Sequence, residues 1–317
     1  MKLLFSILIL AATTAFAQPF PSKPTKMIVP YPPGGSADIL ARAIGAKVGE
    51  ALGQPVVIDN RPGAGTIIGT EATAKSAPDG YTFMLGTVSS HAINPALNPK
   101  LPFDPVKDFT PLSLVASIPF AMIVHPSVPA RSVQEFIALA KARPGQINYS
   151  SAGNGTSNHL AGELLKSMAG IDLVHVPYKG SAPALNDLVA GQVSLMFDLV
   201  LTAAPHIKSG AARGLAVTGA QRSPVLPGLP TVAESGLPDY EVSAWFGIFA
   251  PAGLPQPVAQ RLNAEFVKVM QQPDLKQRLA GLGADPLTST PEQFSSYLRS
   301  EIDKWAKVVK ASGMKLD

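Results

Sequence analysis

Residues 31–53 read YPPGGSADILARAIGAKVGEALG, and the rest of the chain is interpreted outward from this stretch. A short apolar run, residues 27–29, precedes it. After its glycines, apolar residues recur every four positions: Leu40, Ile44, Val48 and Leu52. This pattern predicts a strand, a tight turn and a helix with Ser36 as its N-cap. Exposed backbone N–H groups and the positive end of a helix dipole suit an anion, although any strand-to-helix turn shares this pattern.

Residues 1–17 have the features of a signal peptide. Met1-Lys2 is followed by an apolar run over residues 3–12 and by Ala15-Phe16-Ala17, a small-x-small cleavage pattern. This run is too short to span a membrane, and no other stretch approaches the roughly 20 apolar residues that a span needs. We therefore expect cleavage near Ala17 and export of a soluble protein to the periplasm.

The composition excludes several classes of protein. The chain has 317 residues and no cysteine, which rules out disulfides, thiol catalysis and cysteine metal sites. A chain of this length can bury enough apolar surface without disulfides. The formal charge of +4 falls to +3 when Lys2 leaves with the signal peptide, and no basic cluster is present. Nucleic acid is therefore not an expected partner.

Strand and helix patterns alternate in two sets along the chain. In the first set, residues 55–58 and 81–85 are predicted strands, and residues 66–75 form a predicted helix between them. The alternation predicts a parallel sheet with helices on both faces and ligands beyond the carboxyl ends of its strands. Residues 91–114, rich in Pro and Asn, are predicted to form a long surface connection.

The second set repeats the arrangement of the first. Residues 120–124 form a predicted strand, and Ser132 to Glu135 form a capping box before a helix. A Gly/Ser-rich turn, residues 151–157, then precedes a helix that Gly170 ends. Further strands are predicted over residues 173–176, 193–197 and 215–217. Two such sets predict two lobes that face each other.

The last part of the chain is predicted to return to the first lobe. Residues 245–250 are apolar enough for a crossing strand, and two helices follow, over residues 257–271 and from a second capping box at Thr290. We therefore expect residues 18–122 and 246–317 to form the first lobe and residues 123–245 the second. The hinges are expected near residues 122 and 245.

Motifs for catalysis, cofactors and metals are missing. Residues 63–69 have the spacing GxGxxxG and not the GxGxxG of dinucleotide-binding proteins, and neither GxSxG, HExxH nor a P-loop occurs. The five histidines are scattered without ligand spacing: His91, His125, His159, His175 and His206. We predict no cofactor, no metal and no catalytic residue. Asp38 and Arg42, four apart on a helix, are expected to form an ion pair.

Several linked motifs resemble one known family. They are YPPGGSAD (31–38), IDNRPGAGTIIGTEATAKSAPDGYT (58–82), NYSSAGNGTSNHLAGELL (148–165) and VPYKGSAPALNDLVAGQVSLMFD (176–198). In this order they resemble the Bug (TctC-like) family, the extracytoplasmic solute receptors of tripartite tricarboxylate transporters. The resemblance implies an α/β fold of the type II periplasmic binding protein class, with two lobes, each a mixed sheet flanked by helices, that close over a small carboxylate.

The resemblance also implies a set of ligand-binding residues. In the first lobe these are Pro33, Gly34, Gly35, Ser36, Thr87 and Ser89. In the second lobe they are Ser151, Gly155, Thr156, Ser157, Tyr178, Gly180, Ser181 and Asp198. In the family's first-lobe loop, waters and backbone groups meet the ligand carboxylate, whereas the Asp198 carboxylate could accept from an amino or hydroxyl group. Asn154 and residues 66–68 depart from the smaller, more glycine-rich family pattern, which leaves the ligand size open.

We expect the protein to bind a small ligand without catalysing a reaction. The expected protein is a monomeric periplasmic receptor that delivers a small carboxylate to integral membrane transporter subunits. The same binding fold could instead serve a signalling sensor domain. A third alternative, an exported hydrolase, would require a Ser-His-Asp triad assembled from distant segments.

Overall fold

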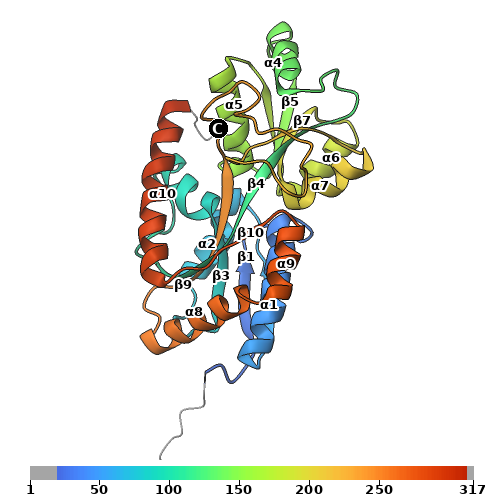
Figure 1. The fold of residues 1–317 in the computed structure, drawn as a ribbon. Helices are drawn as coiled ribbons and strands as arrows, with labels where there is room; N and C mark the ends of the chain where they lie inside the picture. The colour runs from blue at the N-terminus through green and yellow to red at the C-terminus, as the bar shows by residue number, and fades with distance from the viewer. Residues whose placement is uncertain (1–19, 313–317) are drawn as a thin grey trace, which may run out of the picture.

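The structure is a computed structural model that describes residues 20–312. The predicted signal peptide and its cleavage site lie outside this range. Two α/β lobes lie one above the other in Figure 1, and two long strands run between them. The helices of the described range include none that is long and apolar enough to cross a membrane.

The first lobe is built on three parallel strands at the lower end of Figure 1. The central strand β1 (Thr25–Val29) pairs with β2 (Val56–Asn60) on one side and β3 (Thr82–Thr87) on the other. Helix α1 (Ser36–Leu52) follows β1, and α2 (Ile67–Ala74) follows β2. Gly53 ends α1 in the left-handed conformation, with φ of 69°.

The second lobe repeats this arrangement. Its parallel strands are β5 (Asn148–Ser151), β6 (Val174–Pro177) and β7 (Leu195–Leu199), and β8 (Arg213–Val217) lies nearby. The helices are α4 (Val133–Ala142), α5 (Ser157–Ala169), α6 (Ser181–Val189) and α7 (Val200–Ser209). Each of α5, α6 and α7 starts just beyond the carboxyl end of a strand.

Two antiparallel strands connect the lobes. Strand β4 (Phe109–Val124) pairs with β9 (Ser243–Pro251) as far as Pro119, and from Phe120 onward it pairs with β7 and β8. The strand order is β2-β1-β3-β9-β4-β7-β5-β6. One buried hydroxyl ties the crossing segments together, because Thr218 Oγ1 accepts from the Phe120 N–H at 2.8 Å and donates to the Val242 carbonyl at 2.6 Å.

The last three helices of the chain pack on the first lobe. They are α8 (Gln256–Met270), α9 (Pro273–Gly281) and α10 (Pro291–Ser312), and the short strand β10 (Asp285–Pro286) pairs with β4. The buried carboxylate of Glu301 on α10 accepts from the indole N–H groups of Trp245 and Trp305, each at 2.9 Å. The crossing strand β9 is thus fixed to α10.

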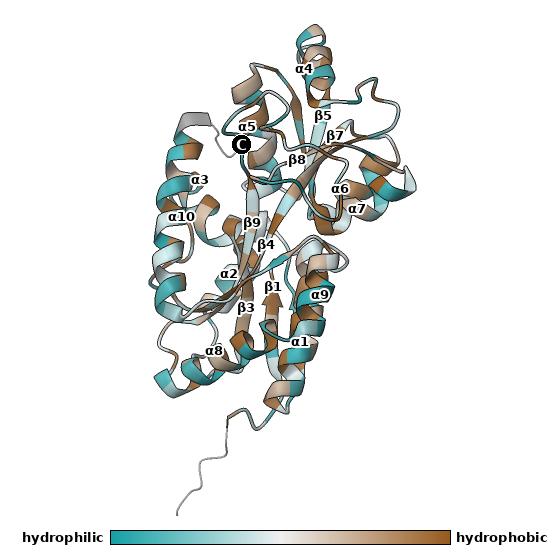
Figure 2. Cartoon of the chain, in the orientation of Figure 1, coloured by the Kyte–Doolittle hydropathy of each residue, from teal (hydrophilic) through white to brown (hydrophobic). Residues whose placement is uncertain are grey.

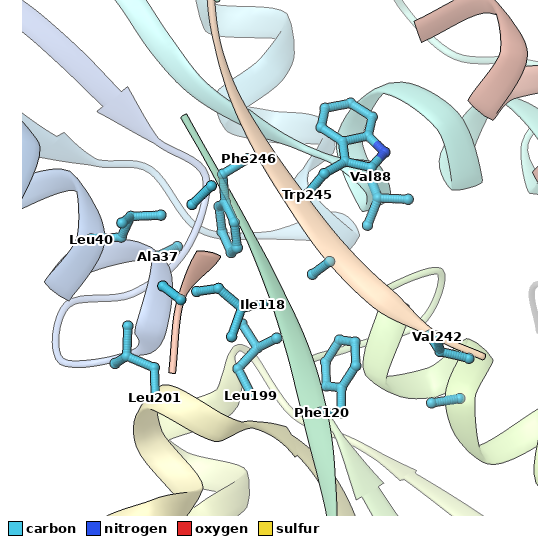
Figure 3. Close-up of a cluster of buried hydrophobic side chains, with 14 of the residues drawn as sticks. Ala37, Leu40, Val88, Ile118, Phe120, Leu199, Leu201, Val242, Trp245 and Phe246 are labelled. Carbon is cyan, nitrogen blue, oxygen red and sulfur yellow. The ribbon is translucent and has the colours of Figure 1, made fainter. Parts of the chain in front are cut away.

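Apolar side chains fill both lobes and the junction between them. Figure 2 shows hydrophobic residues concentrated on the strands and on the inner faces of the helices. At the junction, a cluster in Figure 3 surrounds β4 and β9 and includes Ala37, Leu40, Ile118, Phe120, Leu199, Leu201, Val242, Trp245 and Phe246. Its members come from α1, β7 and α7 as well as from the two crossing strands. One continuous core therefore reaches from the first lobe into the second.

The structure corrects four expectations about secondary structure. Residues 91–114 are not one surface connection, because residues 89–97 are helical, with Ser89 to Asn94 buried, and β4 begins at Phe109. The predicted strand 120–124 is only the end of β4. Helices α7 and α9 were not predicted. The alternation of strands and helices predicted a parallel sheet, but the complete sheet is mixed, because β4 and β9 run antiparallel between the two parallel sets. The two-lobed α/β fold with mixed sheets, which the family resemblance implied, is confirmed.

Candidate functional site

Three helix N-termini meet at a small pocket between the lobes. Helices α1, α5 and α6 begin at Ser36, Ser157 and Ser181, and all three serines line this inner pocket. Thr87, at the end of β3, also lines it. The pocket has a volume of about 30 Å³, enough for one or two water molecules. The N–H groups and the positive dipole ends of the helix starts make this an electropositive position without any cation.

The first of these helix starts is arranged differently from the prediction. Gly35 is the N-cap, and Ser36, predicted to cap α1, is its first helical residue and makes no capping hydrogen bond. The Ser36 hydroxyl lies 2.8 Å from the Thr202 hydroxyl on α7 of the second lobe. Ser36 therefore joins the two lobes at the edge of the pocket.

The predicted ion pair on α1 supports the turn before the helix. Asp38 accepts from the Gly34 N–H at 3.0 Å and pairs with Arg42 at 2.9 Å, and it also accepts from Asn60. Burial acts to raise the pKa of Asp38, but these hydrogen bonds and the Arg42 charge hold that pKa below its ordinary value. The carboxylate thus remains ionised and stabilises the glycine turn.

A second contact joins the lobes at the start of α5. The Ser157 N–H donates to the Ser89 hydroxyl at 3.0 Å, and the two hydroxyl oxygens are 3.4 Å apart. Beside them, the Tyr31 hydroxyl lies 3.2 Å from Thr87 Oγ1, and burial raises the pKa of Tyr31. Ser89 of the first lobe therefore occupies a hydrogen-bonding position at the α5 N-terminus.

A larger cavity opens outside the inner pocket. Its volume is about 380 Å³, and Tyr31 and Pro32 line both spaces. One wall is residues 62–67 of the first lobe, and the opposite wall is residues 152–154 and 177–180 of the second. Many of these residues are apolar or glycine, which is typical of small-molecule sites. The two spaces together form a path from solvent to the helix N-termini.

The lobes touch at two glycines beside this cavity. A Cβ added at Gly65 would lie 2.2 Å from the carbonyl oxygen of Asn154 in the opposite lobe. A Cβ at Gly180 would lie 2.3 Å from Pro32 Cγ. Only glycine permits approaches this close, so the lobes are in direct contact on both sides of the path.

The first-lobe wall has an uncommon backbone. Gly63, Ala64, Gly65 and Thr66 all have positive φ, and the values of 46° for Ala64 and 88° for Thr66 are unfavourable for these residue types. Asn94 holds the loop, because its Nδ2 donates to the Gly65 carbonyl at 2.6 Å and to Thr66 Oγ1 at 3.1 Å. A strained loop is thus fixed against the opposite lobe.

Asp198 lies behind the inner pocket and lines neither space. It is fully buried, and its Oδ2 accepts from the Thr202 hydroxyl at 2.5 Å. Among the described residues, Oδ1 has no hydrogen-bond partner. Burial raises the pKa of Asp198 to about 7, although hydrogen bonds from the Thr202 hydroxyl, the Leu199 N–H and the Ser181 hydroxyl oppose this rise.

The predicted site residues fall into four groups. Those that line the inner pocket are Gly35, Ser36, Thr87, Ser157 and Ser181, and those that line the outer cavity are Tyr178 and Gly180. Those that lie behind the walls are Ser89, Ser151, Gly155, Thr156 and Asp198, all of them buried. Pro33 and Gly34 are exposed and line neither space. Their roles in binding stay predictions.

The walls also contain residues outside the predicted set of ligand-binding residues. The inner pocket also has Pro32, Ala37, Asn158, Leu199, Ala244 and Phe246 in its wall, and the outer cavity has Asn94, Asn154 and Lys179. Lys179, which is exposed, is the cation in these walls, so the described inner pocket has only neutral donors. The apolar wall residues gave no sequence signal, because their patterns are those of ordinary core positions.

Two of the histidines lie against the second-lobe turn at Ser151. His159 and His175 stack with ring centroids 3.9 Å apart, and the Ser151 hydroxyl lies 2.6 Å from His175 Nε2. Burial lowers the pKa of His175 to about 3, so this imidazole would be a poor general base. Neither Ser151 nor His175 lines the two spaces. The residues that the structure describes contain no group of three His, Cys, Asp or Glu side chains suited to a metal.

Comparisons with known sequences agree with this architecture. A family model described as the tripartite tricarboxylate transporter family receptor matches residues 40–314. BugT of Bordetella pertussis is 39% identical over 321 residues, which cover 99% of this chain and 98% of that protein.

Solved structures extend the agreement to the fold. A protein of R. palustris solved with adipate has a TM-score of 0.91 and 38% identity, and the match covers 93% of this chain and 99% of the other. MatC of Rhodopseudomonas palustris, solved with bound malate, has a TM-score of 0.87 and 35% identity over 92% of this chain and all of the other. These neighbours bind small carboxylates. The chain belongs to the tripartite tricarboxylate transporter receptor family, whose members are periplasmic solute-binding receptors.

Proposed function

We propose that this protein captures a small carboxylate between its lobes and presents it to the integral membrane subunits of a tripartite tricarboxylate-type transporter, with no chemical step. The observation that carries the proposal is the meeting of three helix N-termini at the inner pocket without a cation. The adipate and malate complexes of its structural neighbours support a carboxylate as the ligand.

Binding is proposed to require opening and closure of the lobes. The inner pocket of about 30 Å³ is too small for a whole dicarboxylate, so the interlobe contacts Ser36–Thr202 and Ser89–Ser157 are proposed to separate to admit the ligand and to re-form when the lobes close around one of its carboxylates. The proposed hinges are the segments where β4 exchanges β9 for β7 and where β9 begins. These segments lie a few residues before the expected positions 122 and 245. Closure over the ligand then creates the surface that the membrane partner recognises.

A thermal-shift screen against mono-, di- and tricarboxylates, aromatic acids and amino acids tests this function. A ligand at about 100 times its Kd stabilises the folded state by about 2.7 kcal/mol. We expect at least one carboxylate to raise the melting temperature and uncharged analogues to leave it unchanged. Stabilisation by uncharged solutes alone would contradict the proposal. Steady release of product from model esters would favour the hydrolase instead.

A matched pair of variants assigns the effect to the pocket. Gly35 lines the inner pocket, and a Cβ added there meets nothing closer than 4.0 Å, so Gly35→Val fits the fold but fills the space for the ligand. Gly228 also has open space around an added Cβ and lies outside the pocket wall, so Gly228→Val is the control. We expect only Gly35→Val to abolish the carboxylate-induced shift.

A further inference from the structure

A chain of hydrogen bonds links the buried carboxyl of Asp198 to the inner pocket. Asp198 Oδ2 accepts from Thr202 Oγ1 at 2.5 Å, and Thr202 Oγ1 lies 2.8 Å from Ser36 Oγ. Ser36 lines the pocket at the start of α1. The chain therefore begins inside the second lobe, crosses to the first lobe and ends at the ligand position.

The direction of this chain depends on one proton. A hydroxyl has a single hydrogen to donate, and an ionised carboxylate only accepts. When Asp198 is ionised, Thr202 donates to it and Ser36 donates to Thr202, so Ser36 offers only lone pairs to the pocket. When Asp198 Oδ2 is protonated, it donates to Thr202, Thr202 donates to Ser36, and the Ser36 hydrogen is free for a ligand. The Leu199 carbonyl, 3.2 Å from Thr202 Oγ1, is a weaker alternative acceptor.

We propose, as an extension of the proposed function, that Asp198 is a positioning residue that couples carboxylate binding to the uptake of one proton through Thr202 and Ser36. The proton comes from solvent and resides on Asp198 Oδ2 while the ligand is bound. A ligand carboxylate has no hydrogen of its own, so it needs Ser36 as a donor and disfavours Ser36 as an acceptor.

The surroundings of Asp198 favour the protonated form of its carboxyl group. The side chain is fully buried and its Oδ1 has no partner among the described residues, which is costly for an ionised carboxylate. Burial raises the pKa of Asp198 to about 7, near the pH at which a receptor operates. The carboxyl can therefore exchange its proton as the ligand arrives and leaves.

Charged groups on the neighbouring elements do not account for this pKa. The titratable side chains of α1, α5, α6, α7, β5 and β10, together with the lysine two residues before α6, are Asp38, Arg42, Lys47, Glu50, Tyr149, His159, Glu163, Lys166, Lys179, Asp187, His206, Lys208 and Asp285. Neither β4 nor β7 contains another titratable residue. The pKa of Asp198 reflects burial and hydrogen bonds, with no Coulombic contribution from any of these groups. We therefore assign a proton taken up with the ligand to Asp198, and substitution of this residue tests that assignment.

The test measures Kd and proton uptake for malate and adipate by calorimetry at pH 6 and pH 8.5. If only the protonated form binds, a pKa of about 7 makes Kd about 30-fold weaker at pH 8.5 than at pH 6. Titrations at pH 8 in phosphate and in Tris, which differ in ionisation enthalpy, should report close to one proton taken up per ligand.

Variants separate coupling from a structural role. The Asn side chain can donate to Thr202 at any pH, so Asp198→Asn should bind with less than a twofold pH effect and take up no proton. Asp172→Asn, which removes an exposed carboxylate of the same lobe, should behave like the wild type. Thr202→Val should also lose proton uptake, and Thr202→Ser should retain it. A structural defect alone would not produce this pattern.

Three results would overturn the inference. Equal Kd values at both pH values with no proton uptake by the wild type would leave the proposed function standing and the coupling refuted. A 30-fold pH effect that persists in Asp198→Asn would assign the proton to another group. If no carboxylate of the thermal-shift panel binds at either pH, the proposed function itself fails and the coupling with it.

Discussion

Replacement of Gly65 by alanine tests whether the contact between the lobes determines affinity. The added Cβ would lie 2.2 Å from the Asn154 carbonyl oxygen, whereas real Cβ atoms stay at least 3.0 Å from such neighbours. The facing loops must therefore move apart by about 1 Å, because overlap of this size is strongly repulsive. Asn94 holds the Gly65 loop from behind and limits its retreat.

The cost follows from the two interlobe hydrogen bonds. A separation of about 1 Å would lengthen Ser36–Thr202 from 2.8 Å and Ser157–Ser89 from 3.0 Å beyond hydrogen-bonding range. Each such bond contributes about 1 kcal/mol net. The free energy that favours the closed over the open form should therefore fall by about 2 kcal/mol. If closure accompanies binding, this loss weakens ligand binding about 30-fold.

The control separates this effect from backbone strain. Gly65 has φ of 58° and Gly53 has φ of 69°, but an added Cβ at Gly53 meets nothing within 4 Å. Both alanine variants should lose about 1 kcal/mol of unfolding free energy from the left-handed conformation, measured by urea denaturation. Only Gly65→Ala should weaken binding of the best carboxylate from the screen, measured by calorimetry. Wild-type affinity in Gly65→Ala would refute the reasoning.

Three further predictions concern stability and loop order. Glu301→Met leaves two buried indole N–H groups without an acceptor and should lower the unfolding free energy by about 3 kcal/mol in urea titrations, whereas Glu301→Gln, which keeps an acceptor, should lose less than half of that. Asn94→Ala removes both hydrogen bonds to the strained loop and should speed amide hydrogen exchange at Gly65 and Thr66, with exchange elsewhere in the first lobe unchanged. Burial lowers the pKa of His91 from 6.5 to about 3, so the folded state binds fewer protons than the unfolded chain in this window and loses stability as pH falls. His91→Gln should reduce this loss by up to about 1.4 kcal/mol per pH unit, and an unchanged slope would contradict the assignment.

Local signals in the sequence predicted three helix ends correctly. The Thr290 box forms as predicted, because Thr290 N–H donates to Gln293 Oε1 at 2.9 Å and Gln293 N–H donates to Thr290 Oγ1 at 3.2 Å. Gly170 ends α5 with φ of 61°. Ser132 caps α4, although Glu135 binds the N–H of Arg131 in place of the Ser132 N–H. These contacts span only a few residues, so the tertiary fold has little influence on them.

Features that depend on contacts between distant segments could not be predicted from the sequence patterns. The early start of β4 depends on pairing with β9, more than a hundred residues away. The π-helical turn Ser89–Ile93 packs on the same strand, because the His91 ring stacks on Phe249. Thr66 has φ of 88° only because Asn94 and the surrounding fold hold it there, and a β-branched residue gives no local signal for such a conformation. Ser36 was predicted as a cap from its position, but its hydroxyl binds Thr202, a contact that exists only once the lobes meet.

A pocket of neutral donors suits a receptor that must both bind and release an anion. A buried arginine would bind a carboxylate strongly but would be left unpaired when the ligand departs, at a cost of several kcal/mol. Helix N-termini avoid this cost, because water can satisfy their N–H groups when the site is open and empty. Protonation of Asp198 serves the same end, since it removes a negative charge from behind the pocket without introducing a buried cation. In the proposed closure mechanism, the free-energy difference between the empty and the occupied site would thus stay small enough for the lobes to reopen.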